Sequence, residues 1–209
     1  MHSLDNYPFP LVAILRGLTP PEAPAIGRAL FESGFRLIEV PLNRPGALDA
    51  IKALRTVAPD DALIGAGTVL TRGDVDAVAA ACGQFVVSPN CEPDVIRQTV
   101  KCGMLSFPGV ATPTEAFRAL EAGAHALKLF PAEMIPPAVV KALRSVLSEK
   151  THLWPVGGIT PANMGAFVDA GATGFGIGGQ LYRPGTDAAA VKRSAEAFMQ
   201  ARGALMQKS

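Results

Sequence analysis

One lysine stands inside an apolar run, where a charged side chain is costly to keep. Lys128 belongs to the run His125–Phe130, and alternation along a strand would place Ala126, Lys128 and Phe130 on one face and the leucines on the other. Burial favours the neutral amine, which is the form that attacks a ketone to give an imine. A structural lysine that forms a salt bridge with an inward carboxylate fits the same position. The pattern leaves both interpretations open.

A carboxylate occupies a similar setting. Glu39 is flanked by apolar residues in Leu37–Pro41. Because desolvation raises the proton affinity of a carboxylate, Glu39 is a candidate general acid/base. Its structural alternative is to act as the counter-ion of Lys128 or of Arg16. The two roles are compatible.

Glycine pairs and polar residues after apolar runs predict an anion-binding site. Gly157–Gly158 and Gly178–Gly179 follow the last two apolar runs, and Thr160–Pro161 begins a helix directly after the first pair. Exposed backbone N–H groups beside a helix N-terminus favour a phosphate, although glycine pairs are also ordinary turn residues. Arg16 can hold a carboxylate through two hydrogen bonds, and Thr68 can add a hydroxyl donor. Either side chain can instead cap a helix or close a turn.

The elements that must position these residues recur along the chain. Each unit has a short apolar run, a polar turn, an Ala/Leu-rich helical stretch and a glycine, and about eight units follow one another at a mean spacing of roughly 23 residues. Parallel strands buried on both faces give continuous apolar runs of this kind. The expected strands are Leu11–Leu15, Arg36–Pro41, Ala62–Ala66, Phe85–Ser88, Met104–Phe107, His125–Phe130, His152–Val156 and Thr173–Ile177.

Regular alternation of strands and helices is typical of a closed barrel or of a doubly wound open sheet. The number of units favours the barrel. Because no linker, charge block or low-complexity segment divides the chain, we expect an α/β fold with a single (β/α)₈ TIM barrel domain over residues 1–209. Such a barrel gathers its active site at the C-terminal ends of the strands. The polar residues singled out above follow or end the expected strands.

Helix boundaries are marked in the sequence as well. Thr19–Glu22 and Thr112–Glu115 predict capping boxes, with threonine at the N-cap, proline at N1 and glutamate reaching back to free N–H groups. The last helix is expected over Asp187–Met206. Glycines predicted to take a left-handed conformation after a helix are Gly34, Gly83, Gly103, Gly123 and Gly171.

The overall charge points to a small solute as the partner. Lys and Arg total 19 and Asp and Glu total 18, interspersed, which predicts no nucleic-acid and no membrane partner. The three cysteines form no CxxC pair, so neither a disulfide nor a zinc knuckle is expected. Two of the three histidines open expected strands away from the chemistry, and no metal cluster is expected. Without a signal peptide or a membrane-length apolar stretch, we expect a cytoplasmic protein.

Several short motifs carry a resemblance to a known family. The motifs are Val12–Gly17, Ile38–Leu42, Ile64–Val69, Ser88–Asn90, Leu127–Ala132 and Val156–Ile159. In their order and spacing the chain resembles the bacterial 2-keto-3-deoxy-6-phosphosugar aldolases, the KDPG and KDPGal aldolases, over nearly its whole length.

The resemblance implies a class I aldolase in which Lys128 is the Schiff-base lysine and Glu39 the general acid/base. It also implies a phosphosugar acid substrate, a homotrimer and no cofactor, because the iminium takes the part that a metal plays in class II enzymes. Arg16 and Thr68 would hold the pyruvyl carboxylate, and the two glycine pairs would hold the phosphate. The implied substrate-binding residues are Arg16, Asn43, Thr68, Pro89, Phe130, Val156, Gly157, Gly158, Gly178 and Gly179.

Within that family the chain is more similar to the galactonate branch. Pro41–Asn43 stands where the gluconate branch typically has Thr-Leu-Arg, Val156 stands where that branch has threonine, and Leu181–Arg183 follows the last glycine pair. Val156 would remove a hydroxyl near C4 of the substrate, where the two sugars differ in configuration. The chain departs from the family at Gly179, where serine is common, and at Arg44–Pro45, where the branch often has Ser-Pro.

The implied reaction cleaves 2-dehydro-3-deoxy-6-phospho-D-galactonate to pyruvate and D-glyceraldehyde 3-phosphate. The alternatives are a KDPG/4-hydroxy-2-oxoglutarate aldolase, a phosphosugar isomerase or epimerase that uses Glu39 as its base, and a non-catalytic sugar-phosphate binding protein. An imine that can be trapped on Lys128 separates the aldolases from the other two.

Overall fold

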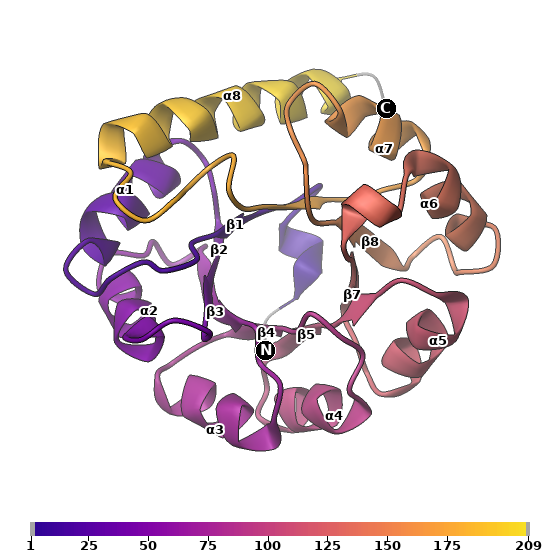
Figure 1. The fold of residues 1–209 in the computed structure, drawn as a ribbon, viewed down its shortest axis with the longest axis horizontal. Coiled ribbons are helices and arrows are strands. Elements are labelled where there is room, and N and C mark those ends of the chain that lie inside the picture. Colours follow the sequence, from indigo (N-terminus) through magenta and orange to yellow (C-terminus); the bar gives the residue numbers. More distant parts are fainter. Residues whose placement is uncertain (1–2, 208–209) are drawn as a thin grey trace.

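Helices surround a curled parallel sheet in the computed structural model, which describes residues 3–207. Strands and helices alternate along the chain. In Figure 1 the strands form an inner ring and the helices α1 to α8 lie outside it. No helix within residues 3–207 combines the length and the apolar character needed to cross a membrane.

Each expected strand has a counterpart in the structure, and the expected last helix is α8, with Asp187 as its N-cap. The strands are β1 (Leu11–Ile14), β2 (Leu37–Pro41), β3 (Leu63–Gly67), β4 (Phe85–Val87), β5 (Leu105–Phe107), β6 (Gly109–Val110), β7 (Ala126–Leu129), β8 (His152–Pro155) and β9 (Phe175–Ile177). The α-helices are α1 (Ala23–Glu32), α2 (Ala47–Arg55), α3 (Arg72–Ala80), α4 (Pro93–Lys101), α5 (Pro113–Glu121), α6 (Pro137–Arg144), α7 (Met164–Asp169) and α8 (Ala188–Met206). The 3₁₀ turns are η1 (Leu4–Asn6) and η2 (Ala132–Met134).

Hydrogen bonding divides the strands into two parallel sheets. One has the order β5-β4-β3-β2-β1-β9, and the other has the order β6-β7-β8. The fifth expected strand, Met104–Phe107, corresponds to β5, whereas β6 was not predicted. The two are separated by Pro108, which has no backbone N–H to continue a ladder. The sheets meet on both sides, since His125 N donates to Ser106 O at 2.9 Å and Thr173 N donates to Leu153 O at 3.0 Å. The predicted α/β class with a curled parallel sheet is therefore confirmed.

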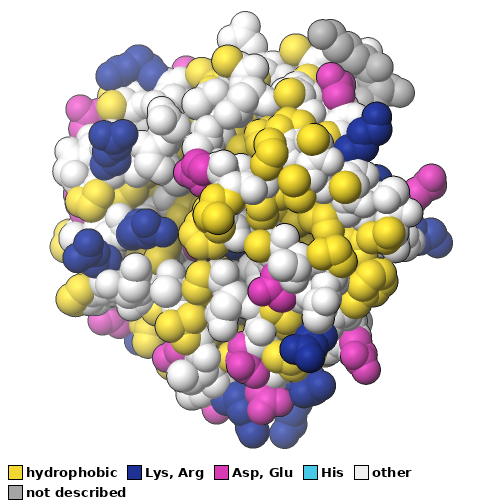
Figure 2. Space-filling model, turned by 45° about the vertical axis from the view of Figure 1, so that its right-hand side comes forward, with side chains coloured by type: hydrophobic (Ala, Val, Ile, Leu, Met, Phe, Trp, Pro, Cys, Tyr) yellow, Lys and Arg dark blue, Asp and Glu magenta, His cyan; other side chains and the backbone are white. Residues whose placement is uncertain are grey.

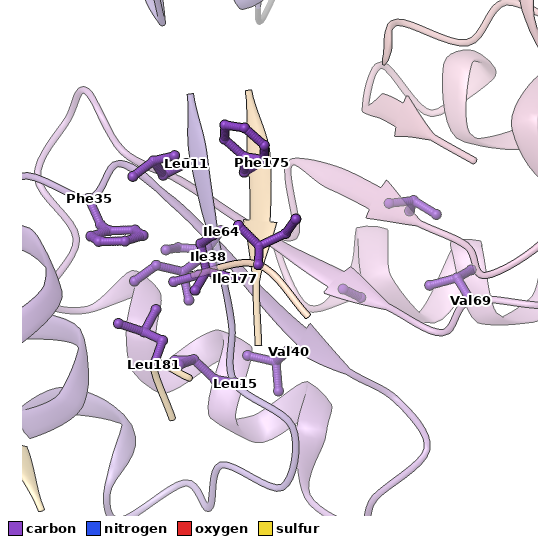
Figure 3. Close-up of a cluster of buried hydrophobic side chains, with 14 of the residues drawn as sticks. Leu11, Leu15, Phe35, Ile38, Val40, Ile64, Val69, Phe175, Ile177 and Leu181 are labelled. Carbon is purple, nitrogen blue, oxygen red and sulfur yellow. The ribbon is translucent and has the colours of Figure 1, made fainter. Parts of the chain in front are cut away.

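The strands bury both of their faces, in two separate clusters. Alternate residues such as Ile38, Val40 and Ile64 pack in the large cluster beneath the helices, part of which is drawn in Figure 3. Their neighbours Leu37 and Leu63 belong to a smaller cluster on the opposite face of the sheet. Burial on both faces explains why the strands are continuous apolar runs in the sequence.

The smaller cluster fills the amino ends of the strands. The Phe107 ring meets the Trp154 ring edge-on at 4.7 Å between centroids. Leu4 of η1 joins this cluster, and the Tyr7 hydroxyl donates to Asp61 O at 2.9 Å. In Figure 1 the indigo η1 turn lies within the ring of strands. The N-terminal segment therefore covers the amino ends of the strands.

The two predicted capping boxes have different outcomes. At α5 the prediction is confirmed, because Thr112 Oγ1 accepts from Glu115 N at 3.3 Å and the Glu115 carboxylate accepts from Thr112 N at 2.9 Å. At α1 it is wrong, since the helix begins at Ala23 and Glu22 is its N-cap. The two prolines before Glu22 form a separate turn. Thr19 N still donates to the Glu22 carboxylate at 3.3 Å.

The predicted left-handed glycines are confirmed at all but one position. At Gly83 the prediction is wrong, because Cys82 takes the left-handed conformation with φ 60°. A side chain at Gly83 is excluded for another reason: a Cβ there would lie 2.4 Å from Val78 Cγ1. The confirmed positions are Gly34, Gly103, Gly123 and Gly171.

Candidate active site

A cavity of about 980 Å³ opens at the carboxyl ends of the strands. Its lining comes from segments that follow or end β1, β2, β7, β8 and β9, as expected for an active site in this kind of fold. The predicted site residues that line it are Arg16, Phe130, Val156, Gly157, Gly158, Gly178 and Gly179.

Lys128 lies on β7, where the strand register pairs it with Gly109 of β6 and Trp154 of β8. Its side chain shares the inner face of the sheet with Trp154 and is only 7% exposed. Lys128 Nζ lies 4.6 Å from the centroid of the Phe130 ring, which itself lines the cavity. Among residues 3–207, no hydrogen bond or ion pair to Nζ is formed, so the structural salt bridge considered as the alternative is absent there.

Glu39 lies on β2 with an exposed fraction of 3%, opposite Gly65 in the register of β2 and β3. Its carboxyl group occupies space that a glycine leaves open. A Cβ on Gly67 would lie 1.7 Å from Glu39 Oε1. Gly67 is thus a positioning residue that the sequence reasoning missed, although a glycine inside an apolar strand signals such a close approach.

The two buried ionisable groups shift each other's proton affinity. Burial raises the pKa of the Glu39 carboxyl, while the positive charges of Lys128 and Arg16 oppose that rise. Burial lowers the pKa of the Lys128 amine, Arg16 lowers it further, and Glu39 opposes the change. Desolvation is the largest cause in both cases, so the apolar interior favours the neutral amine that imine formation requires.

One wall of the cavity is apolar and closely packed. Val156 follows β8, is 8% exposed and forms a bridge with Gly176 of β9. A Cβ on Gly176 would lie 2.7 Å from Val156 Cγ2, so glycine is needed for this approach. The sequence reasoning identified Val156 but not Gly176.

The two glycine loops present free backbone donors. Within the described chain, Gly157, Gly158, Gly178 and Gly179 donate no backbone hydrogen bond. Gly157 and Gly158 both have positive φ, 117° and 60°, which explains why glycine is required at each. N–H groups without protein acceptors at the edge of a cavity are suited to an anion.

In each glycine loop a carbonyl oxygen accepts a hydrogen bond from a side chain that follows the loop in the sequence. Asn163 Nδ2 donates to Gly158 O at 2.9 Å, and Arg183 Nε donates to Gly179 O at 3.0 Å. In both loops the carbonyl of the second glycine is tied to the protein. Neither Asn163 nor Arg183 was a predicted site residue.

Besides the buried Lys128 and Glu39, three predicted site residues do not line the cavity. Asn43 is exposed, in the segment between β2 and α2. Thr68 is half-buried after β3 and has a left-handed backbone with φ 55°. Pro89 is half-buried, and its carbonyl oxygen would lie 2.3 Å from a Cβ on Gly109. Their contact with a substrate stays a prediction.

The cavity also contains charged residues that the sequence reasoning did not place in a site. Glu133, in η2, lines the cavity, and a Cβ on Gly157 would lie 2.2 Å from its Oε2. The side chain of Glu133 is exposed, and its carboxylate lies beside the first glycine loop. Arg44 and Arg183 line the cavity too. Both arginines lie in loops, where no strand or helix periodicity in the sequence could predict the direction of their side chains.

Together the fold and the cavity define a class of protein: a parallel α/β enzyme whose site lies at the carboxyl ends of its strands. More specifically, the chain belongs to the KDPG and KHG aldolase family, whose profile matches residues 8–194. It is therefore an aldolase, a carbon–carbon lyase.

Individual relatives agree with this assignment. The chain is 47% identical to 2-dehydro-3-deoxy-6-phosphogalactonate aldolase of Escherichia coli strain K12, over 92% of this chain and 94% of that protein. A native KDPGal structure matches with a TM-score of 0.93 at 46% identity, covering 95% of this chain and 97% of that one. A KDPG aldolase from Legionella pneumophila, with pyruvate captured at low pH as a covalent carbinolamine intermediate, matches with a TM-score of 0.79 at 27% identity, covering 96% of this chain and 95% of that one.

Proposed function

We propose that the protein cleaves 2-dehydro-3-deoxy-6-phospho-D-galactonate to pyruvate and D-glyceraldehyde 3-phosphate through a Schiff base on Lys128. The observation that carries this proposal is the Lys128 amine itself: it is 7% exposed, has its pKa lowered by burial and has no ion-pair partner among the described residues. An amine in that state is a nucleophile for a ketone. The carbinolamine in the Legionella relative supports the same chemistry here.

In the proposed reaction the Lys128 amine attacks the C2 ketone, and loss of water gives an iminium. Glu39, directly or through a water, takes the proton of the C4 hydroxyl while the C3–C4 bond breaks and its electrons move into the iminium. The aldehyde leaves, the resulting enamine is protonated at C3, and water releases pyruvate from the lysine. Burial of Glu39 supports this role, because a raised pKa lets the carboxyl both take up and return a proton.

The anionic ends of the substrate are assigned to the two ends of the cavity. Arg16 lines the cavity and its charge acts on the pKa values of both Lys128 and Glu39, which supports a contact with the carboxylate next to the ketone. Thr68, Asn43 and Pro89 are retained as further substrate contacts on this side. The free N–H groups of the two glycine loops support phosphate binding. An anchored phosphate would hold C2 against the lysine.

The preference for the galactonate epimer is assigned to Val156, which presents an apolar surface to the cavity. The test is a side-by-side retro-aldol assay on the gluconate and galactonate substrates, with pyruvate as the readout. We expect a higher kcat/KM for the galactonate epimer. Equal or reversed values would reject the role of Val156 and favour a KDPG/4-hydroxy-2-oxoglutarate aldolase.

Borohydride reduction in the presence of pyruvate tests the Schiff base. We expect a covalent adduct on the tryptic peptide that contains Lys128. No adduct, together with interconversion of phosphosugars, would support the isomerase; no adduct and no turnover would support a binding protein.

We propose that the two sheets form one closed (β/α)₈ barrel in a single domain, residues 1–209. Backbone hydrogen bonds at both seams support closure, and the bridge between Val156 and Gly176 extends the second seam. Counting β5 and β6 as one interrupted strand gives the eight strands of a TIM barrel.

We propose that the chain forms a homotrimer. Figure 2, turned so that the side with α5 and α6 comes forward, shows hydrophobic side chains gathered on one face. Phe117 of α5 is 51% exposed and Met134 of η2 is 77% exposed. Large exposed apolar patches favour association between subunits. Sedimentation equilibrium should give three times the monomer mass.

A cytoplasmic location is proposed as well. The three cysteines are all free thiols in the structure, which fits a reducing compartment. Fractionation of the native cells, with recovery of the activity outside the soluble cytoplasmic fraction, would contradict it.

A further inference from the structure

The second glycine loop carries a cation of its own. Arg183 lines the cavity, and its Nε donates to Gly179 O at 3.0 Å, which fixes the guanidinium group to the loop. The backbone is held too, since Arg183 N donates to Thr186 Oγ1 and Thr186 N donates to Arg183 O. Within residues 3–207, the terminal nitrogens of Arg183 form no ion pair. The guanidinium group is therefore fixed through Nε, while its terminal nitrogens have no ion-pair partner there.

The other charged residues of the cavity have different surroundings. Arg16 is exposed and lines the cavity directly after β1, the strand that pairs with the β2 strand of Glu39. Arg44 lines the cavity from the segment after β2, and no hydrogen bond of its side chain is formed among the described residues. Arg183 alone of the three is bonded to a loop whose N–H groups are free.

In the first glycine loop, Gly157–Gly158, the loop is held by an uncharged side chain, that of Asn163. Asn163 Nδ2 holds Gly158 O at 2.9 Å, the same kind of contact that Arg183 makes with Gly179 O, but without a charge. Holding the loop thus requires one N–H donor and no cation. The terminal N–H donors and the positive charge of Arg183 are therefore not needed to hold the loop.

We propose that Arg183 binds the phosphate group of the substrate through its terminal guanidinium N–H groups and determines the selection of phosphorylated over unphosphorylated sugar acids. This inference rests on the proposed function and deepens it. Nε keeps the peptide of Gly179 in place, while the other nitrogens complete a phosphate site formed by backbone N–H groups. Arginine suits this role because its planar fork matches two phosphate oxygens.

The test compares Arg183→Gln with the matched variant Arg193→Gln, which removes the same charge from an exposed position on α8. Gln at position 183 keeps an N–H donor but no charge. For each protein, kcat/KM is measured with the phosphorylated sugar acid and with its unphosphorylated counterpart, and the ratio of the two is the readout. The rate of hydrogen exchange at C3 of pyruvate in D₂O reports on the lysine end alone.

A hydrogen bond to a charged group corresponds to roughly a tenfold to hundredfold change in binding. We expect Arg183→Gln to lower the ratio by about that factor, mainly through KM, and to leave pyruvate exchange unchanged. Arg193→Gln should change neither. A ratio equal to that of Arg193→Gln, or an equal fall with both substrates, would overturn the inference, because the second result is that of a side chain that only holds the loop.

Arg183→Lys keeps the charge without the fork and covers the case in which Arg183→Gln fails to fold. It should lower the same ratio by a smaller factor, and an unchanged ratio would overturn the inference. Failure of the proposed function has a separate signature: the wild-type protein would then show neither cleavage nor pyruvate exchange.

Discussion

The proposed active site has a buried end, at Lys128 and Glu39 beneath the cavity, and an open end, at the glycine loops of the cavity wall, and the two are built on different physical principles. At the buried end, Lys128 and Glu39 stand on strands, and the register together with apolar neighbours fixes their side chains. At the open end, the glycine loops present free backbone N–H groups and are held by Asn163 and Arg183. Function at the buried end depends on the identity and desolvation of single groups. At the open end it is shared among several donors, so each one matters less.

The largest effect is expected for Lys128→Met. Loss of the amine removes the covalent step, so carbon–carbon cleavage should fall by at least about 10³-fold. Arg at this position should behave in the same way, because guanidinium does not form the imine. Pyruvate release measures the loss, and borohydride trapping should disappear with it. Lys101→Met, at an exposed position in α4, is the control. Cleavage at the native rate in either Lys128 variant would remove the basis of the proposed mechanism.

A smaller loss is expected for Glu39→Gln, because the lysine can still form its imine. Removal of a general acid/base typically lowers kcat by about 10²–10⁴-fold. Since burial raises the pKa of Glu39, wild-type kcat/KM should fall on acidification at a higher pH than for an ordinary carboxylate. The variant should lose that limb of the pH profile. It should also trap pyruvate at lower pH than the wild type, because the Glu39 charge raises the pKa of Lys128.

Glu121→Gln is the matched control, since Glu121 is exposed at the end of α5. An acid limb that persists unchanged in Glu39→Gln would assign it to another group.

Gly67→Ala tests whether catalysis depends on the position of the Glu39 carboxyl group as well as on its presence. The added Cβ would lie 1.7 Å from Glu39 Oε1, so the carboxyl must move. Overpacking of this kind costs about 1–3 kcal/mol of unfolding free energy. Activity should fall toward that of Glu39→Gln, as measured by kcat beside a denaturation curve. Gly203→Ala, in α8, where a Cβ meets nothing within 4 Å, should leave activity unchanged and should not lower the unfolding free energy. Full activity in Gly67→Ala would show that Glu39 does not depend on its placement.

The smallest effect is expected at the open end, for Asn163→Ala. The variant loses the hydrogen bond to Gly158 O, a contact that contributes about 0.5–1.5 kcal/mol. KM for the phosphorylated substrate should rise roughly twofold to tenfold, with pyruvate exchange unchanged. A loss of kcat/KM as large as that of Glu39→Gln would contradict the view that each donor at the open end contributes less than a single group at the buried end.

The strands and the inward residues were predictable because each follows from a short-range pattern. Alternation along His125–Phe130 placed Lys128 on the inner face, and the apolar flanks of Glu39 indicated its burial. The capping box of α5 was predictable for the same reason, since all its partners lie within four residues.

Features that depend on packing between elements were not predictable in this way. Cys82, and not Gly83, takes the left-handed conformation, and glycine is needed at position 83 for its close approach to Val78, a contact that the helix signal does not contain. Glu133 and Arg183 follow different strands, β7 and β9, and only the packing of the two sheets against each other brings them to one cavity. Asn43 and Pro89 rested on the family resemblance and Thr68 on its position after an expected strand, and the contacts of all three stay predictions.

The N-terminal turn has a consequence for the order of product release. Leu4 and Tyr7 cover the amino ends of the strands, and the Lys128 amine lies beside Phe130, which lines the cavity at the carboxyl ends, so a substrate would enter from that side. In the proposed reaction the aldehyde phosphate lies between the imine and that opening, so it departs first and pyruvate follows. Turnover then obeys an ordered uni-bi scheme: pyruvate, the last product to leave, competes with the substrate, whereas the aldehyde phosphate inhibits noncompetitively.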